Sequence, residues 1–507
     1  MQIKNLTITH KKDLRLLVEN LSFSLQPGDC AVIIGEEGNG KSTILKWIAD
    51  PKKIENYAEW TGEVVKGRVG YLAQELEDWE RELSVYEFCT KEAMFWETSP
   101  AELANYAKEL DIPMELFFSE QKLGTLSGGE RVKIQMARLM IAKPDAFLLD
   151  EPSNDIDLNT LEWLEQWMSQ CTKPILYVSH DEILIEQTAN MIIHLEQIVR
   201  KTKPKHTVVR MRYSEYIANR QMNLDKQIQE AGNQKRERKK QQERFQRVQQ
   251  KVEHAQSSVS RQSPHAGKML KRKMKAVKAM ERRYEREWKD RVKVPDTEDA
   301  IFIKFEKASS IPNGKTVLDF HLDQLTCNET ILANDISLRV VGTEKVVIVG
   351  KNGIGKSTLL KKIAETLFSR TDITVGYMPQ NYEEQLNQNE TPVQYLSVTG
   401  EKEELTQIRT YLGSMKYTPD EMDHAILELS GGQKAKLFLL KMSLLGCNVL
   451  ILDEPTRNLS PLSNPVIRKS LRAFPGAIIS VSHDRVYIEE VCDRIYEFTK
   501  EGLEPLE

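Results

Sequence analysis

The sequence has few cysteines and no long apolar run. Its six cysteines are spread over 507 residues without any paired spacing, so neither a zinc site nor a disulfide framework is indicated. No window approaches about 18 uninterrupted apolar residues, and the N-terminal stretch MQIKNLTITHKKDLR lacks the apolar core of a signal peptide. We therefore expect a cytosolic protein without a membrane span.

The length and the distribution of charge point to several domains and a polyanionic partner. A chain of 507 residues is too long for one hydrophobic core, and two to four domains of ordinary size are expected. The net charge is −4, but residues 213–294 carry 23 lysines and arginines against 10 acidic residues. An acidic body with a basic insert of this strength predicts attraction to a polyanion.

Five motifs occur twice, in the same order, which predicts a duplicated unit. In the first half they are IGEEGNGKST, GYLAQ, LSGGE, AFLLDEP and YVSHD, and in the second half VGKNGIGKST, GYMPQ, LSGGQ, VLILDEP and SVSHD. The runs CAVIIG and VVIVG are typical of strands buried on both faces of a parallel sheet. The glycines that follow allow a turn whose N–H groups face phosphates, with Lys41 or Lys356 adding positive charge.

The remaining motifs carry residues suited to hydrolysis. Strands AFLLD and VLILD would bring Asp150 and Asp453 to the carboxyl edge of a sheet, where α/β proteins bind ligands. Glu151 and Glu454 follow directly, placed to orient or deprotonate an attacking water.

Each motif also has a simpler interpretation. A lone histidine after an apolar strand, such as His180 or His483, is more often structural than catalytic. A phosphate loop can match by accident, and LSGGE could be an ordinary helix start capped by Ser127. All five motifs in order, twice, strongly disfavour these simpler interpretations.

This constellation resembles the ABC ATPases, and the resemblance covers nearly the whole chain outside the basic segment. In that family two nucleotide-binding domains close face to face around two ATP molecules, and the signature serine and glycines of one domain complete the site of the other. The resemblance implies an α/β fold with two tandem P-loop ATPase domains that pair within one chain. The N–H groups and dipole of each signature helix would then bind the γ-phosphate.

Carried over onto this sequence, the resemblance implies two composite sites for ATP and Mg²⁺. The first comprises Gly35, Glu36, Glu37, Gly38, Asn39, Gly40, Lys41, Ser42, Thr43, Gln74 and Asp150, with Ser430, Gly431 and Gly432. The second comprises Gly350, Lys351, Asn352, Gly353, Ile354, Gly355, Lys356, Ser357, Thr358, Gln380 and Asp453, with Ser127, Gly128 and Gly129. The implied Mg²⁺ ligands are Ser42, Gln74 and Asp150 in one site and Ser357, Gln380 and Asp453 in the other. The implied catalytic residues are Glu151 and Glu454, which activate water, and His180 and His483, which sense the γ-phosphate.

The first phosphate loop departs from the second. Glu36 and Glu37 put two carboxylates beside a polyphosphate, and Asn352 stands where the first loop has Glu37. Because such a loop binds phosphate through its backbone, we expect both side chains to point away from the nucleotide, although weaker affinity at this site stays open. No aromatic residue that would stack on adenine is evident, and His10 is a weak candidate in the first half.

The basic segment, 213–297, is expected to form a helical hairpin between domains at 1–212 and 298–507. A proline-free stretch predicts a helix of about 70 Å from Ser214 to Val259, SSVSRQSPHAG then marks a tip near 257–266, and a second helix is expected at 268–292. Residues at 3,4 spacing predict an antiparallel seam. They are Phe245, Val248, Val252, Ala255 and Val259 in the first helix and Leu270, Met274, Val277, Glu281, Tyr284 and Trp288 in the second.

A charged hairpin could be a solvated spacer. The runs KRERKK and KMLKRKMK, however, concentrate positive charge that a spacer would balance with glutamate. Contacts to a phosphate backbone explain them better. Because few aromatic residues interrupt the runs, packing against folded RNA is favoured over stacking on single-stranded bases.

Tandem ATPase domains joined by a basic helical linker narrow the resemblance to the ABC-F proteins. Members of that family bind the ribosome near the tRNA exit site, and their linker reaches toward the P-site tRNA and the peptidyl-transferase centre. The resemblance implies a bacterial ribosome as partner, through large-subunit rRNA and P-site tRNA, with release by hydrolysis. It also implies a cytoplasmic, ribosome-associated location.

The second half carries DEPTRNLSPLSNPVIR where the first has DEPSNDID. This form resembles the antibiotic-resistance branch, the Vga/Lsa-like proteins that protect ribosomes from lincosamides, pleuromutilins and group A streptogramins. Ser460 lacks the carboxylate of Asp157, so unequal communication between the sites is expected. The alternatives are a housekeeping ABC-F translation factor, a transporter ATPase subunit with separate membrane partners, and a DNA-maintenance ATPase, whose usual zinc clusters or very long coiled coils are missing.

Overall fold

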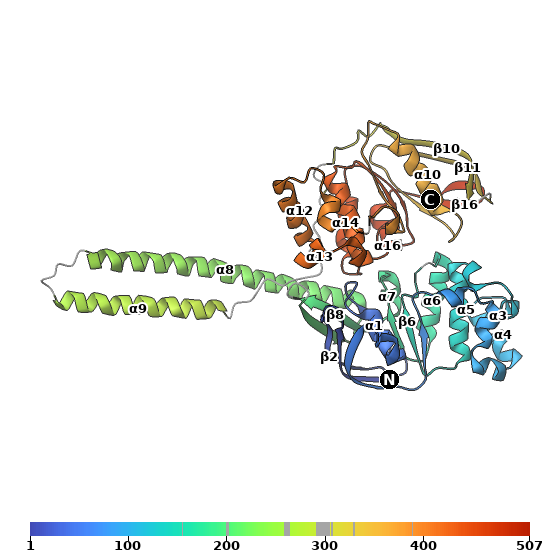
Figure 1. Ribbon diagram of the computed structural model, residues 1–507, viewed down its shortest axis with the longest axis horizontal. Coiled ribbons are helices and arrows are strands. Elements are labelled where there is room, and N and C mark those ends of the chain that lie inside the picture. Colours follow the sequence, from blue (N-terminus) through green and yellow to red (C-terminus); the bar gives the residue numbers. More distant parts are fainter. Residues whose placement is uncertain are drawn as a thin grey trace. The chain divides into compact units, whose positions relative to one another are not determined.

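The computed structural model describes residues 1–154, 156–198, 202–257, 264–289, 305, 308–327, 330–387 and 389–506. The chain divides into two compact units, of which the first contains Met1–Tyr213 and Glu298–Glu507 and the second contains Ser214–Thr297. Two similar α/β halves, one from each end of the chain, make up the first unit (Figure 1). The expected α/β fold class is confirmed.

A six-stranded sheet forms the centre of the first half. Its strands follow the order β5-β6-β7-β3-β8-β9, with β9 antiparallel to β8 and the other neighbours parallel. Strands β3, β6 and β7 are buried along their whole length, which explains their continuous apolar sequences. The strands are β3 (Cys30–Ile34), β5 (Val69–Leu72), β6 (Ala146–Asp150), β7 (Ile175–Val178), β8 (Met191–Ile198) and β9 (Lys203–Val209).

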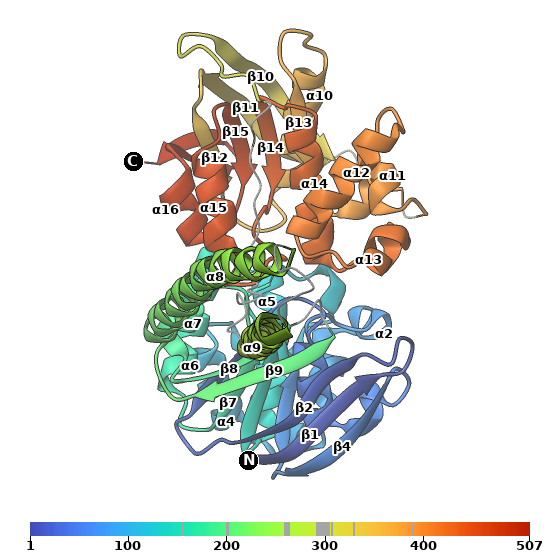
Figure 2. The same ribbon diagram turned by 90° about the vertical axis from the view of Figure 1, so that its left-hand side faces the viewer.

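The second half repeats this topology with the strand order β13-β14-β15-β12-β16-β17. Figure 2 shows β12, β14 and β15 side by side in this sheet. Because strands that carry equivalent motifs take equivalent places, the repeat in sequence is a repeat in three dimensions. The strands are β12 (Lys345–Val349), β13 (Val375–Met378), β14 (Val449–Asp453), β15 (Ala477–Val481), β16 (Arg494–Thr499) and β17 (Gly502–Leu506).

Each half adds a smaller antiparallel sheet. In the first half β1 (Gln2–His10) pairs with β2 (Leu16–Ser24) and β4 (Ala58–Val65), and in the second half β10 (Thr316–Cys327) pairs with β11 (Thr330–Val341). These strands alternate buried and exposed residues along much of their length, as expected for a sheet with one face on the core.

Helices connect the strands in the same order in both halves. After the phosphate loops come α1 (Lys41–Ala49) and α10 (Lys356–Phe368), and the signature motifs begin α5 (Gly128–Ile141) and α14 (Gly431–Leu444). The later strands lead into α6 (Leu158–Gln170), α7 (Glu182–Thr188), α15 (Asn464–Arg472) and α16 (Arg485–Val491). Further helices precede each signature: α2 (Asp78–Arg81), α3 (Val85–Thr90), α4 (Pro100–Glu109), α11 (Pro392–Leu396), α12 (Lys402–Ser414) and α13 (Pro419–Asp423).

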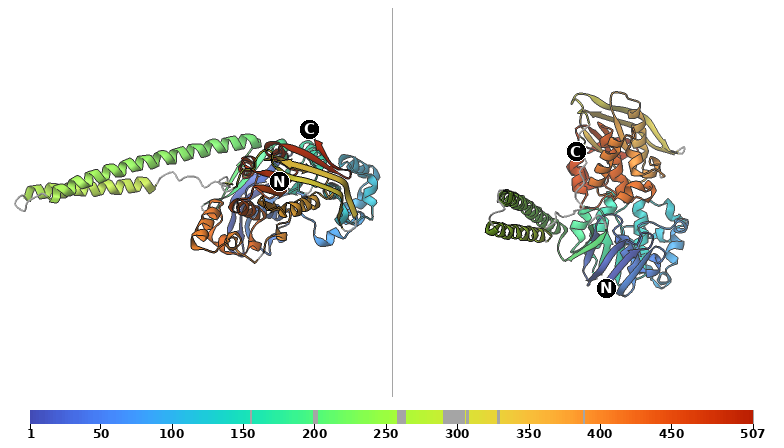
Figure 3. Two further views of the ribbon diagram at one scale, coloured as in Figure 1. Left: turned by 90° about the horizontal axis from the view of Figure 1, so that it is seen from above. Right: turned by 60° about the vertical axis from the view of Figure 1, so that its left-hand side comes forward.

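The basic segment forms two helices, α8 (Tyr213–Ser257) and α9 (Pro264–Lys289), which run side by side (Figure 3). The predicted start of the second helix at residue 268 was wrong, because α9 already begins at Pro264. Proline is tolerated in the first turn of a helix, where its missing N–H has no partner to lose. Residues 258–263 and 290–297, which include the centre of the expected tip, lie outside the described residues.

The expected seam is partly correct. Val252 and Val277 are buried, and Phe245, Met274 and Tyr284 are half-buried. Val248 and Glu281 are exposed, so their inclusion was wrong. Val259 and the side chains of Ala255, Leu270 and Trp288 lie outside the described part of the chain. None of the described helices combines the length and apolar character needed to span a bilayer.

Candidate nucleotide sites

Both phosphate loops require glycine where the chain leaves the central strand. Gly35 has a φ of 146° and Gly350 a φ of 143°, in the region that favours glycine. A methyl group on Gly35 would collide with the carbonyl oxygen of Leu195, and one on Gly350 with that of Phe498. The loops are therefore pinned against a neighbouring strand, with their turns closed tightly enough to cradle phosphate.

The loop lysines are held inside their own loops. Lys41 Nζ donates to the carbonyl oxygen of Gly35 at 2.9 Å, and Lys356 Nζ donates to that of Gly350 at 2.7 Å and to Asn352 Oδ1 at 3.2 Å. Both side chains are largely buried. A fixed cation at a helix N-terminus is suited to binding an anion.

The first half presents a serine, an aspartate and a tyrosine in one network. Ser42 Oγ donates to Asp150 Oδ1 at 2.8 Å, and Tyr71 Oη donates to Asp150 Oδ2 at 3.1 Å. Burial raises the pKa of Asp150, while the Ser42 hydrogen bond opposes the rise. Gln74, which follows β5, is exposed.

The equivalent oxygens of the second half fit a hard cation. Both carboxylate oxygens of Asp453 are buried and, among the described residues, have no hydrogen-bond partner at normal geometry. Burial raises the pKa of Asp453, and the neighbouring Ser357 opposes the rise. Gln380 lines the same cavity as these two residues. Hydroxyl, amide and carboxylate oxygens with unused lone pairs are the ligands that Mg²⁺ prefers.

The glutamate after each strand adopts a strained backbone. Glu151 and Glu454 both have a φ of 51°, a left-handed conformation that is uncommon outside glycine. The N–H of each donates to the adjacent strand, to Val178 O at 3.0 Å and to Val481 O at 2.9 Å. Such strain persists where the surrounding structure over-determines it, which is common at active sites.

The two glutamates differ in their electrostatic surroundings. Burial would raise the pKa of Glu151, but His180, whose Nε2 lies 3.0 Å from Glu151 Oε1, outweighs it and the pKa is lowered. Burial, with the charge of Asp453, raises the pKa of Glu454 to about 8. His483 Nε2 lies 3.9 Å from Glu454 Oε1. Glu151 is therefore ionised at neutral pH, whereas Glu454 is mostly protonated.

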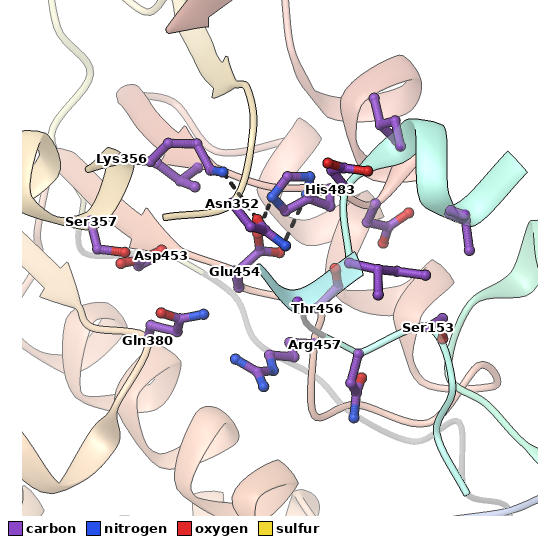
Figure 4. A pocket seen from close by; sticks show the side chains of 18 of the residues that line it. Ser153, Asn352, Lys356, Ser357, Gln380, Asp453, Glu454, Thr456, Arg457 and His483 are labelled. Atoms are coloured by element: carbon purple, nitrogen blue, oxygen red, sulfur yellow. Dashed lines mark hydrogen bonds and ion pairs between the residues drawn. The ribbon is translucent and has the colours of Figure 1, made fainter. Parts of the chain in front are cut away.

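A cavity of about 470 Å³ lies between the second phosphate loop and the first half. Figure 4 shows Lys356, Ser357, Asp453, Glu454 and Ser153 around it. The lining from the second half includes Asn352, Gly353, Gly355, Lys356, Ser357, Thr358, Gln380, Asp453, Glu454 and His483. The lining from the first half includes Gly128, Arg131, Ser153, Asn154, Asp157 and His180. The structure thus brings the second phosphate loop and the first signature motif together.

The first signature reaches this cavity through Gly128. Ser127 caps α5 in a reciprocal arrangement with Glu130, and Gly129 is buried where a methyl group would collide with Thr160. The N-terminus of α5 therefore begins at the cavity, and the N-terminus of a helix favours an anion.

At the other signature the first loop itself makes the contact. The N–H of Gly432 donates to Glu37 Oε2, and Lys436 Nζ lies 3.3 Å from Glu36 Oε1. A cavity of about 20 Å³ lies beside these residues, and Ser430 also lines it. The expectation that Glu36 and Glu37 point away from the nucleotide stays a prediction. Their carboxylates point across to the N-terminus of α14, where a helix attracts negative charge.

Sequence reasoning did not place Asp157 and Arg457 in the second site. Asp157 caps α6, with Oδ1 accepting the N–H of Thr160 at 2.9 Å, and its charge acts on Lys356 of the opposite half. Arg457 lines the cavity and acts on the pKa of Glu454. Asp157 is the fifth residue after the first DEP motif and Arg457 the second residue after the other, and this nearness to the motifs is the sequence signal that could have identified them. His10, the candidate for adenine stacking, has its Nδ1 2.7 Å from Asp13 Oδ1.

A phosphate loop that meets the signature of the opposite half, twice in one chain, defines a tandem ABC ATPase. A family model described as ABC transporter matches residues 18–154 and 333–457, which together exceed half of the chain. The chain belongs to this family, and it is an ATPase.

Its relatives include an ATP-binding protein and an F family member that each match nearly the whole chain. YdiF of Bacillus subtilis (strain 168), named as an ATP-binding protein, is 28% identical over 96% of this chain and 78% of its own length. The ABC transporter F family member 5 of Arabidopsis thaliana is 24% identical over 96% of this chain and 73% of its own. Among solved structures, the complex of the archaeal ribosomal stalk protein aP1 with the archaeal ribosome recycling factor aABCE1 matches with a TM-score of 0.60. That match has 17% identity over 99% of this chain and 89% of that chain, and it supports the fold alone.

Proposed function

We propose that this chain is an ABC-F ATPase that binds the ribosome when ATP holds its two halves together. The observation that carries the proposal is the cavity of about 470 Å³ lined by the second phosphate loop and the first signature. A nucleoside triphosphate that fills this cavity would contact both halves at once, so its binding favours the arrangement in which the halves meet. Hydrolysis would remove the bridging phosphate and allow release.

Within each site the residues have separate tasks. Lys41 and Lys356 neutralise the phosphates, and Glu151 and Glu454 orient and deprotonate the attacking water. His180 and His483 contact the same carboxylates and the γ-phosphate. Ser42, Gln74 and Asp150, with Ser357, Gln380 and Asp453, would hold Mg²⁺, which supplies charge neutralisation at the transferred phosphoryl group. The signature residues of each half complete the other site.

The basic helices α8 and α9 are the proposed RNA-binding element. Lys235, Arg236, Lys239 and Lys240 on α8, and Lys271, Arg272 and Lys273 on α9, are exposed or nearly so. A rod with such a surplus of positive charge suits the phosphate backbone of folded RNA. We infer ribosomal RNA as that partner from this basic surface and from the resemblance of the chain to the ABC-F proteins.

The finer proposal is binding of a bacterial ribosome at the tRNA exit site, with α8 and α9 directed toward the P-site tRNA and the peptidyl-transferase centre. We further propose that this displaces drugs such as lincosamides, pleuromutilins and group A streptogramins. The replacement of Asp157 by Ser460 at the equivalent position of the second half supports the resistance branch. A housekeeping translation factor is the alternative, and a cytoplasmic location follows from either partner assignment.

Sedimentation tests ribosome binding. The E151Q/E454Q chain should bind ATP without hydrolysing it and accumulate on 70S ribosomes, at least about tenfold above its level with ADP. The unmodified chain, which releases after hydrolysis, is the matched control. Absence of both proteins from the ribosomal pellet in ATP would refute the proposal.

Drug susceptibility separates the two translational functions. Expression of the unmodified chain in a sensitive bacterium should raise the inhibitory concentration of at least one of the three drug classes, and expression of E151Q/E454Q should not. An unchanged inhibitory concentration for all three classes, with ribosome binding intact, would favour the housekeeping function.

A further inference from the structure

Four charged residues outside the nucleotide sites occupy equivalent positions in the two halves. The spacing of 303 residues that relates the two DEP motifs and the two SHD motifs also relates Glu165 to Arg468 and Glu182 to Arg485. Glu165 lies on α6 and Arg468 on α15, while Glu182 begins α7 and Arg485 begins α16. The first half thus has an acid at both positions, and the second half has a base at both.

These residues pair between the halves. Arg468 donates to Glu182 through two bonds, Nη1 to Oε1 at 2.6 Å and Nη2 to Oε2 at 3.1 Å, and its Nε donates to Glu490 Oε2 at 2.7 Å. The side chain of Arg468 is only 3% exposed and that of Glu182 only 15%. This is a bidentate arginine–carboxylate pair, the geometry with the greatest strength and directional specificity.

The second pair is its counterpart across the repeat. Arg485 donates to the carboxylate of Glu165 through both terminal nitrogens, Nη1 to Oε2 at 3.4 Å and Nη2 to Oε1. The side chain of Glu165 is 7% exposed and that of Arg485 is 23% exposed. None of the four residues lines the cavity of about 470 Å³, so the pairs are separable from nucleotide contacts.

From this arrangement we infer that the four residues form a charge code that allows only unlike halves to pair. If two first halves met in the same way, Glu165 would face Glu182, and if two second halves met, Arg468 would face Arg485. Two first halves would bury two carboxylates side by side. Two second halves would bring two guanidinium groups together, with Glu490 still beside Arg468. Both meetings replace an attraction by a repulsion between like charges, which is costly at a buried position. The code therefore combines attraction for the correct partner with repulsion of the wrong one. The code concerns the contact between the two ATPase halves, so the inference does not depend on ribosome binding.

Charge reversal in the full-length chain tests the code. All variants are made in an E490Q background, because the carboxylate of Glu490 would otherwise repel a glutamate at position 468. E182R and R468E should each lower kcat for ATP hydrolysis at least about tenfold, because each leaves like charges buried together. The double variant E182R/R468E should recover to within about threefold of the E490Q chain. K469E, which reverses an exposed charge on the same helix, is the control and should leave kcat unchanged.

A second set tests whether the two pairs act as one code. E165R/E182R makes both positions of the first half basic and should abolish activity, and adding R468E/R485E should restore it. Recovery in both sets, with kcat affected more than KM, supports the inference. The inference is overturned if the E182R/R468E variant is as inactive as the single variants, or if the quadruple variant is as inactive as E165R/E182R, whether these proteins are folded or unfolded. Full activity of the single reversals also overturns it.

Discussion

At the scale of single residues, the two sites of this chain are built alike but charged differently. Glu151 and Glu454 share the same strained backbone, yet His180 holds the first carboxylate ionised while burial and Asp453 keep the second protonated at neutral pH. A carboxyl group must be ionised before it can accept a proton from water. The two sites should therefore hydrolyse ATP with different dependence on pH.

Single-site variants reveal that difference. In E151Q the remaining activity comes from the second site, and single-turnover hydrolysis should rise roughly twentyfold from pH 6.5 to 8.5, as Glu454 with a pKa of about 8 loses its proton. In E454Q the remaining activity comes from Glu151, whose pKa is lowered, so the rate should stay nearly level over that range. Parallel profiles for the two variants would contradict the assignment.

We expect Glu37 to compete with nucleotide for a backbone donor. Its carboxylate accepts the N–H of Gly432 at the start of α14, a group suited to phosphate. Replacing it in E37N should raise ATP affinity at the first site about tenfold, measured with a fluorescent ATP analogue in the E151Q/E454Q background. The reciprocal change N352E should lower affinity at the second site. If E37N leaves the ATP affinity of the first site unchanged and N352E leaves that of the second site unchanged, the carboxylate does not compete with nucleotide.

The sequence predicts most of the residues that surround the phosphate loops, but it does not predict which way their side chains point. The motifs predicted which residues would surround the phosphate loops, because backbone geometry is shared by all such loops. They could not predict that Glu37 turns toward Gly432 or that Asp157 acts on Lys356. Both contacts join residues about 200 or more positions apart, and they depend on how the two halves meet.

At the scale of elements, the helices of the basic segment followed the sequence closely except at their ends. The absence of proline and the apolar spacing predict two long helices. Pro264 marks an interruption in the sequence pattern, yet in the structure it fits the first turn of α9. The spacing also places Val248 in the seam, whereas the structure leaves it exposed. A regular 3,4 pattern specifies a face, whereas the extent of burial depends on the partner helix.

The exposed bases of α9 should carry RNA affinity. The triple variant K271Q/R272Q/K273Q should weaken ribosome binding about tenfold. The slope of log affinity against log salt concentration should become shallower by roughly two, because binding with fewer phosphate contacts releases fewer counterions. Its ATP hydrolysis without ribosomes should be unchanged. The matched control K402Q/K469Q/K500Q removes as many exposed charges from the ATPase halves. If both triples weaken binding equally, α9 has no special role.

At the scale of the whole molecule, the chain has two halves of the same fold that carry opposite charges where they meet. The repeated motifs were enough to predict two α/β halves, since each motif specifies a strand, a loop or a helix start. They were not enough to predict the ion pairs of Arg468 and Arg485 with the first half, because charged residues on a helix face are usually solvated. The two halves are therefore similar in fold but complementary in charge at these positions.

We propose that ATP bound between the halves commits the protein to ribosomal RNA. The most direct measurement is electron cryomicroscopy of E151Q/E454Q with ATP and 70S ribosomes. We expect nucleotide between each phosphate loop and the opposite signature, with α8 and α9 in contact with large-subunit rRNA or tRNA. Ribosomes without the protein, or a bound protein whose α8 and α9 contact no RNA, would contradict it.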